Sequence, residues 1–155
     1  MPDNHLSKEK TDSNRALVCT CGRLRRTAQQ VTRLYNAALR PVGLTLMQFS
    51  ILATVSRSDG LSVTQLAQLL GLERTTLTRD LRPLELAGWI ADGVGTDKRS
   101  RKLSLTVDGI GKLQQARPLW RSAEEDLRRT VGPDKVEDLV RLLDLVFGET
   151  SRVNS

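Results

Sequence analysis

The sequence predicts a mainly α-helical fold that contains one small β-hairpin. Apolar residues recur at steps of three and four through most of the chain, which is the period of amphipathic helices. Near residue 90 this period gives way to two short strand-like runs around a glycine- and charge-rich stretch, as in a hairpin. The chain has 155 residues, of which 39% are hydrophobic and 27% charged, so it has the length and balance of one globular domain. Its apolar runs are all shorter than the roughly 20 residues that cross a bilayer, which predicts no membrane association.

The N-terminal region divides into a polar arm and a long helix. Residues 1–14 are polar and without periodicity, so we expect a flexible arm. They also lack the apolar segment of a secretory signal, which predicts a cytoplasmic protein. A helix over residues 15–40 follows and ends near Pro41 and Gly43. Its apolar face consists of Leu24, Ala28, Val31, Leu34, Ala38 and Leu39.

Capping signals mark the next two helices. Thr45 can cap a helix that stops in the polar stretch at 57–60. Ser62 and Gln65 form a capping box, in which the serine hydroxyl accepts from a backbone N–H and the glutamine side chain reaches back. This box predicts a short helix at 63–70.

A glycine turn then leads into a further helix. Gly71 provides the turn before a helix at 73–87. Pro83 lies inside this helix and removes one of its hydrogen bonds, so we expect a kink near Arg79. The apolar side of the helix consists of Leu77, Leu81, Leu84 and Ala87.

The basic residues gather in two places. Strands predicted at 89–92 and 102–106 enclose a loop in which four of the five residues at 98–102 are basic. The helix at 15–40 carries six arginines and no acidic residue. With 24 Lys and Arg against 18 Asp and Glu, the formal charge is +6, which favours an anionic partner.

Two long helices close the chain. Thr106 caps the first of them, Gly109 weakens its first turn, and Pro118 is expected to bend it. The last helix begins at Pro133, and residues 149–155 are expected to form a C-terminal tail. Its apolar stripe consists of Val136, Leu139, Val140, Leu143 and Val146.

The order of the elements at 45–106 is that of a winged helix-turn-helix. A short capped helix, a glycine turn, a second helix and a hairpin with a basic loop follow one another there. This order suits double-stranded DNA, because the second helix fits the major groove and a loop of arginines can reach the narrow minor groove beside it.

Specific sequence motifs strengthen this interpretation. They are Leu44-Thr45-Leu46-Met47-Gln48-Phe49, Leu66-Ala67, Leu70-Gly71-Leu72, Leu84-Glu85-Leu86-Ala87-Gly88-Trp89-Ile90, Asp97-Lys98-Arg99-Ser100-Arg101 and Leu103-Ser104-Leu105-Thr106. With these motifs, residues 15–148 resemble the multiple-antibiotic-resistance regulator (MarR) family of dimeric winged-helix transcription factors. The resemblance implies a homodimer, built from the helices at 15–40 and 107–148, that regulates transcription from a pseudo-palindromic operator. We expect a repressor that an inducer releases.

The predicted DNA contacts lie on the helix at 73–87 and on the hairpin loop. Hydroxyl and guanidinium groups suit phosphates and base edges, whereas three threonines are poor choices for a merely solvated helix face. Arg79 is the predicted reader of a guanine edge, and Arg99 the predicted minor-groove contact, with Asp97 placed to orient an arginine. The alternative is a solvated charged surface without a ligand. The full predicted set is Thr75, Thr76, Thr78, Arg79 and Arg82 on the helix, and Asp97, Lys98, Arg99 and Arg101 on the loop.

Two cysteines stand at the start of the first helix. Cys19 and Cys21 lie within about one turn of Arg23 and Arg25, and both the helix N-terminus and these cations favour a thiolate. In the cytoplasm both cysteines are expected to be thiols. The alternative to a reactive pair is two small, inert packing residues.

The resemblance extends in part to the organic-hydroperoxide-sensing branch of the family. An ungapped match through Tyr35 and Leu44-Thr45 puts Cys21 at the position of that branch's reactive cysteine. It implies that Tyr35 is one of two tyrosines that hydrogen-bond the thiolate. This sequence departs from the branch at Leu46, the position of the second tyrosine, and at Arg25, the position of a further aromatic residue.

An enzyme is not predicted. The single histidine, His5, lies in the polar arm, and the sequence has no glycine-rich phosphate loop or carboxylate dyad. No strand-helix-strand order surrounds the two cysteines, as thiol–disulfide chemistry would require. We therefore expect no catalytic residue, no cofactor and no resident metal.

The sequence leaves the inducer open. Oxidation of Cys21 and Cys19 is one route of release. A soft metal or metalloid is another, because two thiolates per chain supply four across a dimer, although two thiols without a nearby histidine are a weak ligand signal. A small aromatic acid bound between the DNA-binding and dimerisation parts is the third.

Overall fold

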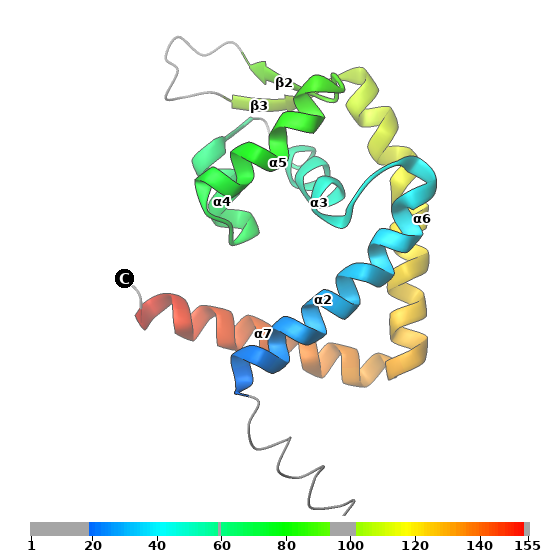
Figure 1. Cartoon of the computed structure of the whole chain (residues 1–155), viewed down its shortest axis with the longest axis vertical. Coiled ribbons are helices and arrows are strands. Elements are labelled where there is room, and N and C mark those ends of the chain that lie inside the picture. The colour runs from blue at the N-terminus through cyan, green and yellow to red at the C-terminus, as the bar shows by residue number, and fades with distance from the viewer. Residues whose placement is uncertain (1–18, 59, 94–101, 154–155) are drawn as a thin grey trace, which may run out of the picture. The chain divides into compact units, whose positions relative to one another are not determined.

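The computed structural model describes residues 19–58, 60–93 and 102–153 (Figure 1). The chain divides into two compact units, residues 1–34 and 35–155. Helix α2 (Thr20–Leu39) begins in the first unit and ends in the second. The predicted first helix is therefore confirmed over Thr20–Leu39, whereas Cys19 precedes it and Arg40 begins a 3-10 turn.

A short 3-10 turn ends this helix and leads into the next. Turn η1 (Arg40–Val42) is closed by Gly43 at a φ of 66°, which is the left-handed region that favours glycine. Helix α3 (Leu46–Val55) then begins at a capping box. Thr45 Oγ1 accepts from the Gln48 N–H at 3.2 Å, and Gln48 Oε1 accepts from the Thr45 N–H at 2.9 Å, which confirms the predicted cap.

Helices α4 (Val63–Leu70) and α5 (Arg74–Leu86) form the predicted helix-turn-helix. The bounds of α4 agree with the prediction, and α5 is shorter by one residue at each end. Pro83 lies one turn from the end of α5, and its carbonyl still accepts from the Ala87 N–H at 3.0 Å. The helix therefore continues through the proline.

The hairpin belongs to a three-stranded antiparallel sheet in the order β1-β3-β2. Strands β2 (Ile90–Gly93) and β3 (Lys102–Leu105) form the predicted hairpin. Strand β1 (Leu61–Ser62) pairs with the other edge of β3, with Leu61 opposite Leu103. The sequence did not predict β1, because two residues are too few to show an alternation.

The core of the winged helix lies between α3, α4, α5 and the sheet. Its fully buried side chains include Ile51, Leu52, Val55, Leu66, Leu77, Leu84 and Leu103. Phe49 of α3 stacks on Trp120 at 5.6 Å between ring centroids, which joins the winged helix to the next helix along the chain.

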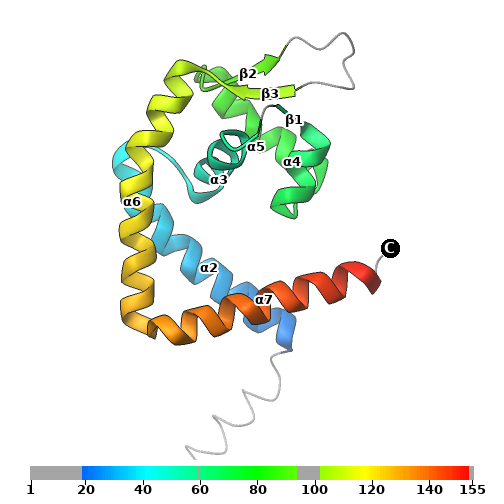
Figure 2. The ribbon, with the colours of Figure 1, turned by 180° about the vertical axis from the view of Figure 1, so that it is seen from behind.

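Helix α6 (Val107–Val131) carries Pro118 in its interior, and Figure 2 shows that its axis changes direction along its length. Helix α7 (Pro133–Val153) follows after Gly132. No single helix in the described part of the chain is long and apolar enough to cross a membrane; α2 with η1 and α3 pass that test only together, as a bent pair.

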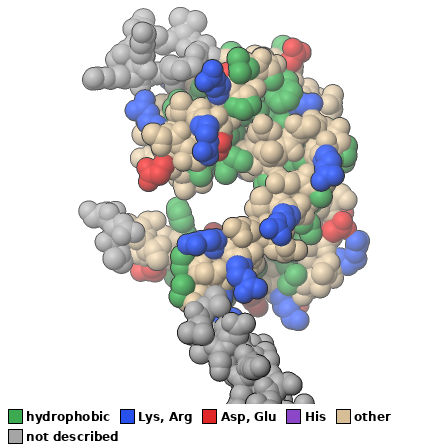
Figure 3. Space-filling view, viewed as in Figure 1, with side chains coloured by type: hydrophobic (Ala, Val, Ile, Leu, Met, Phe, Trp, Pro, Cys, Tyr) green, Lys and Arg blue, Asp and Glu red, His purple; other side chains and the backbone are tan. Residues whose placement is uncertain are grey.

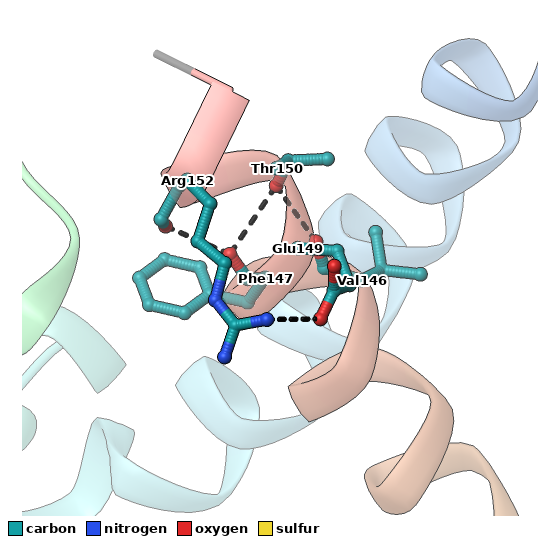
Figure 4. A network of polar contacts seen from close by, with 6 residues as sticks. Val146, Phe147, Glu149, Thr150 and Arg152 are labelled. Atoms are coloured by element: carbon teal, nitrogen blue, oxygen red, sulfur yellow. Dashed lines mark hydrogen bonds and ion pairs between the residues drawn. The ribbon is translucent and has the colours of Figure 1, made fainter. Parts of the chain in front are cut away.

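The expected C-terminal tail was wrong for residues 149–153, because α7 continues to Val153. Side chains in this last stretch donate to the helix's own carbonyls (Figure 4). Thr150 Oγ1 donates to the Val146 oxygen at 2.7 Å, and Arg152 pairs with Glu149 at 2.9 Å. The helix therefore continues past Val146, the last apolar residue of the stripe, and the Arg152–Glu149 ion pair supports its last turn.

Candidate nucleic-acid interface

The turn between α4 and α5 fixes where the second helix of the motif begins. The capping box predicted for α4 is present, with Ser62 Oγ accepting from the Gln65 N–H at 3.2 Å. Gly71 ends α4 in the left-handed region at a φ of 63°, and its N–H donates to α4 carbonyls. Helix α5 starts three residues later, after Glu73.

One side of α5 is buried and the opposite side is exposed. Leu77, Leu81 and Leu84 face the core. Since each helical residue advances about 100° around the axis, the side opposite these leucines carries Thr75, Arg79 and Arg82, all of which are exposed. In the view in which α5 lies at the front, Figure 3 shows Lys and Arg side chains exposed over this part of the molecule.

The other two predicted threonines lie beside this line. Thr76 is half-buried. Thr78 is exposed, and its hydroxyl donates to the Arg74 carbonyl at 2.8 Å, so that the oxygen keeps only its acceptor capacity for an outside partner. Of the three predicted threonines, Thr75 therefore has the hydroxyl donor that is most accessible to an outside partner.

The two predicted arginines of α5 differ in their partners. Arg79 is 77% exposed, and its Nε lies 3.6 Å from a carboxylate oxygen of Asp80. A pair so exposed contributes little to stability and leaves most guanidinium donors available. Arg82 makes no ion pair within the described residues.

The predicted loop contacts Asp97, Lys98, Arg99 and Arg101 lie outside the described residues. The stem that carries this loop is described: Gly93 of β2 pairs with Lys102 of β3. Lys102 is one of the basic residues at 98–102 but was not among the predicted DNA contacts.

Hydrogen bonds to backbone carbonyls connect the start of α6 to the residues just before β2. The Thr106 N–H donates to the Trp89 carbonyl at 3.1 Å, and Thr106 Oγ1 donates to the Gly88 carbonyl at 2.6 Å. The same hydroxyl oxygen accepts from the Gly109 N–H at 3.0 Å and so caps α6, as predicted. Lys112 lies over the Trp89 ring at 4.8 Å from its centroid.

Both cysteines are exposed thiols. Cys19 precedes α2 and is not part of its first turn, which corrects the expected placement; its Sγ accepts from the Gly22 N–H at 3.4 Å, as an N-cap side chain does. Cys21 lies in the first turn, and an Arg25 Nη2 donates to its Sγ at 3.9 Å.

Tyr35 has a different partner from the expected thiolate. It is buried, and its hydroxyl makes a short hydrogen bond to Glu124 of α6, whose other oxygen accepts from Arg128 Nε at 3.0 Å. Burial, the hydrogen bond and the charge of Glu124 raise the pKa of Tyr35 above its ordinary value. The partner of the Tyr35 hydroxyl within this chain is thus Glu124, and the hydrogen bond expected from Tyr35 to the thiolate stays a prediction. Sequence spacing carries no signal for a pair so far apart along the chain.

Metal binding has no preformed site within the described residues, which contain no group of three or more His, Cys, Asp or Glu side chains placed to hold an ion.

Known proteins share this architecture and this sequence pattern. Residues 42–100 match the family model described as MarR family. The multiple antibiotic resistance protein MarR of Salmonella typhimurium is 30% identical over 122 residues, which cover 77% of this chain and 84% of that protein. A crystal structure of the Mycobacterium tuberculosis regulator MosR in complex with DNA is 39% identical, with a TM-score of 0.73, and covers 84% of this chain and 97% of that one.

A third relative was solved with a small molecule. The M. tuberculosis MarR-family protein Rv2887 in complex with salicylic acid is 28% identical, with a TM-score of 0.63, over 83% of this chain and 96% of that one. Fold, helix-turn-helix geometry and sequence similarity agree: this chain belongs to the MarR family and is a DNA-binding transcriptional regulator rather than an enzyme.

Proposed function

We propose that this protein is a homodimeric repressor that covers a pseudo-palindromic operator, with one α5 helix in the major groove of each half-site. The observation that carries the proposal is the outward line of Thr75, Arg79 and Arg82 opposite the buried leucines of α5. In this arrangement Arg79 reads a base edge, Thr75 and Arg82 contact phosphates, and Arg99 on the loop enters the minor groove. Such a protein works where the chromosome is, in the cytoplasm.

The apolar surface of α7 supports the homodimer. Leu142, Leu145 and Phe147 are each about 60% exposed, whereas Val136 on the same helix is buried. Leu139, Val140, Leu143 and Val146 of α7 are also 41–46% exposed. An exposed apolar surface of this extent favours a protein partner. A second copy of the chain is the partner that the family implies, with the helices at 15–40 and 107–148 forming the interface.

The dimer and the operator are tested separately. Light scattering after gel filtration should give twice the chain mass for the wild type and a monomer for Leu142→Glu with Leu145→Glu. Leu69→Glu is the matched control, because Leu69 is 65% exposed but lies on α4, outside the proposed interface. A wild-type monomer, or a control that dissociates equally, would contradict the proposed interface. Mobility shift on the DNA upstream of the protein's own gene then tests the operator.

For the inducer, we infer release through oxidation of Cys21. Its thiolate attacks a hydroperoxide, which yields a sulfenic acid and releases an alcohol or water; a second thiol then displaces water to form a disulfide. Cys21 is exposed beside Arg25, as a reactive thiol needs to be. Cys19 or a thiol of the second copy is the resolving group.

The geometry favours the interchain disulfide. An intrachain bond between Cys19 and Cys21 would give up the hydrogen bond that Cys19 Sγ accepts from the Gly22 N–H at the start of α2. A bond between copies leaves the turn intact and changes the spacing of the two recognition helices.

Two other inducers remain as alternatives for the same repressor. The salicylic acid complex of the relative Rv2887 supports a small aromatic acid. A soft metal or metalloid would need thiols of both copies. Mobility shifts repeated with a hydroperoxide, arsenite and salicylate distinguish the three, because only the inducer releases the operator.

A further inference from the structure

Lys102 occupies a fixed position at the root of the hairpin loop. It is the first residue of β3, opposite Gly93 of β2 and Ser62 of β1. Leu103 is buried, so the alternation of the strand puts Lys102 and Ser104 on the outer face, where both are exposed. The position is therefore set by pairing on both sides of a central strand.

The side chain of Lys102 lies along the backbone of Gly60. A β carbon added to Gly60 would stand 3.1 Å from Cδ and 3.2 Å from Cβ of Lys102. Gly60 has a φ of 106°, which L side chains rarely adopt. Glycine at this position therefore permits this backbone conformation and also leaves room for the Lys102 side chain. The contact restricts the aliphatic part of the side chain, which reduces the entropy that a bound partner would have to remove.

The ammonium has no ion-pair partner among the residues that the structure describes. Arginines on the long helices do have such partners, for example Arg129 with Asp126 and Arg141 with Asp138. Ser62, which pairs with Lys102 on the neighbouring strand, is also the N-cap of α4, so the backbone of Lys102 is held next to the start of the first helix of the motif.

We propose that Lys102 is a phosphate-binding residue of the DNA interface, seated by Gly60 and distinct from the basic residues of the loop itself. The proposal rests on the proposed function, because the anion is the backbone of a DNA duplex. A lysine binds phosphate as a point charge, so this interaction adds affinity for any sequence and does not discriminate between bases.

Salt dependence is the measurement that tests it. Fluorescence anisotropy of the full chain with an operator duplex and a scrambled duplex is measured over a range of salt for the wild type and Lys102→Gln. The slope of log K against log salt should fall in magnitude by about 0.9 for each phosphate that the variant leaves unneutralised, or about 1.8 for a dimer. At about 0.1 M salt, affinity for both duplexes should fall on the order of tenfold for each such phosphate.

Two variants make the result specific. Lys112→Gln removes the same charge from a lysine that lies over Trp89, and it should keep the wild-type slope. Lys102→Arg keeps the charge and should also keep the slope. A wild-type slope in Lys102→Gln, or an equal decrease in Lys112→Gln, would overturn the assignment. If the wild type itself binds no duplex, the proposed function fails. If the wild type binds and Lys102→Gln keeps the wild-type slope, only the assignment of Lys102 fails.

Discussion

Gly109 at the start of α6 lies against the carbonyl of Trp89, so that a β carbon on Gly109 would stand only 2.0 Å from the Trp89 oxygen. No side chain fits this space without a shift of backbone. The glycine that lowers the helix propensity of the first turn therefore permits the contact that joins the hairpin to α6.

Gly109→Ala should lower the free energy of unfolding by about 2–3 kcal/mol, because the added methyl group would force the Trp89 carbonyl and the start of α6 apart. The matched control is Gly111→Ala. A β carbon on Gly111 meets nothing within 4 Å, so this change should raise stability by about 0.5–1 kcal/mol through helix propensity. Urea denaturation followed by circular dichroism measures both. Equal effects of the two substitutions would contradict the proposed role of the close approach.

Arg79→Ala should flatten the sequence preference at one position in each half-site. A bidentate arginine–guanine contact is worth about 1–3 kcal/mol of discrimination. Binding to a set of operators with single base changes measures this. Arg152→Ala is the control, since Arg152 is also 77% exposed but lies near the end of α7, beyond the proposed dimer interface. If affinity falls equally for all sequences, Arg79 is a phosphate contact instead.

Arg99→Ala should weaken DNA binding and leave the dimer intact, because the residue lies in the hairpin loop and outside the apolar stripes of the long helices. The magnitude of the salt slope should decrease by about one for each chain, or about two for a dimer. Arg152→Ala, beyond the proposed dimer interface, provides a matched removal of an exposed guanidinium. Unchanged affinity and slope in Arg99→Ala would remove the loop arginine from the interface.

Cys21→Ser should bind the operator normally and resist release by hydroperoxide, since the hydroxyl does not form a sulfenic acid. Cys19→Ser should lose any disulfide that Cys19 resolves and keep a slower response. Mobility shift with non-reducing electrophoresis follows both steps. Wild-type protein that stays on its operator in excess hydroperoxide, with both thiols still open to alkylation, would exclude the redox route.

Tyr35→Phe should lower stability by about 1–2 kcal/mol, because Glu124 loses a hydrogen-bond donor in a partly buried site but keeps Arg128. The pKa of Tyr35 is raised in the folded state, so the unfolded chain releases the phenol proton first. Wild-type stability should therefore decline as pH rises above the ordinary tyrosine pKa of 10.0, and this decline should be smaller in the variant. Denaturation midpoints between neutral and alkaline pH measure the difference; parallel pH profiles would contradict it.

The sequence determined the elements whose signals are local. The cap at Thr45 and the capping box at Ser62 marked where α3 and α4 begin, because each satisfies backbone N–H groups within four residues of itself. Leucines at 77, 81 and 84 assigned the buried side of α5, and with it the exposed side that carries Arg79 and Arg82. The winged helix-turn-helix followed from the order of these elements.

Tertiary structure decided the features that depend on distant residues. Strand β1 exists because β3 offers a free edge, and Tyr35 donates to Glu124 because two helices bring these residues together. The close approach of Gly109 to Trp89 and the seat of Lys102 on Gly60 likewise join separate segments. Periodicity and capping describe each segment's own preference, whereas these contacts arise only when the core has fixed the segments against one another.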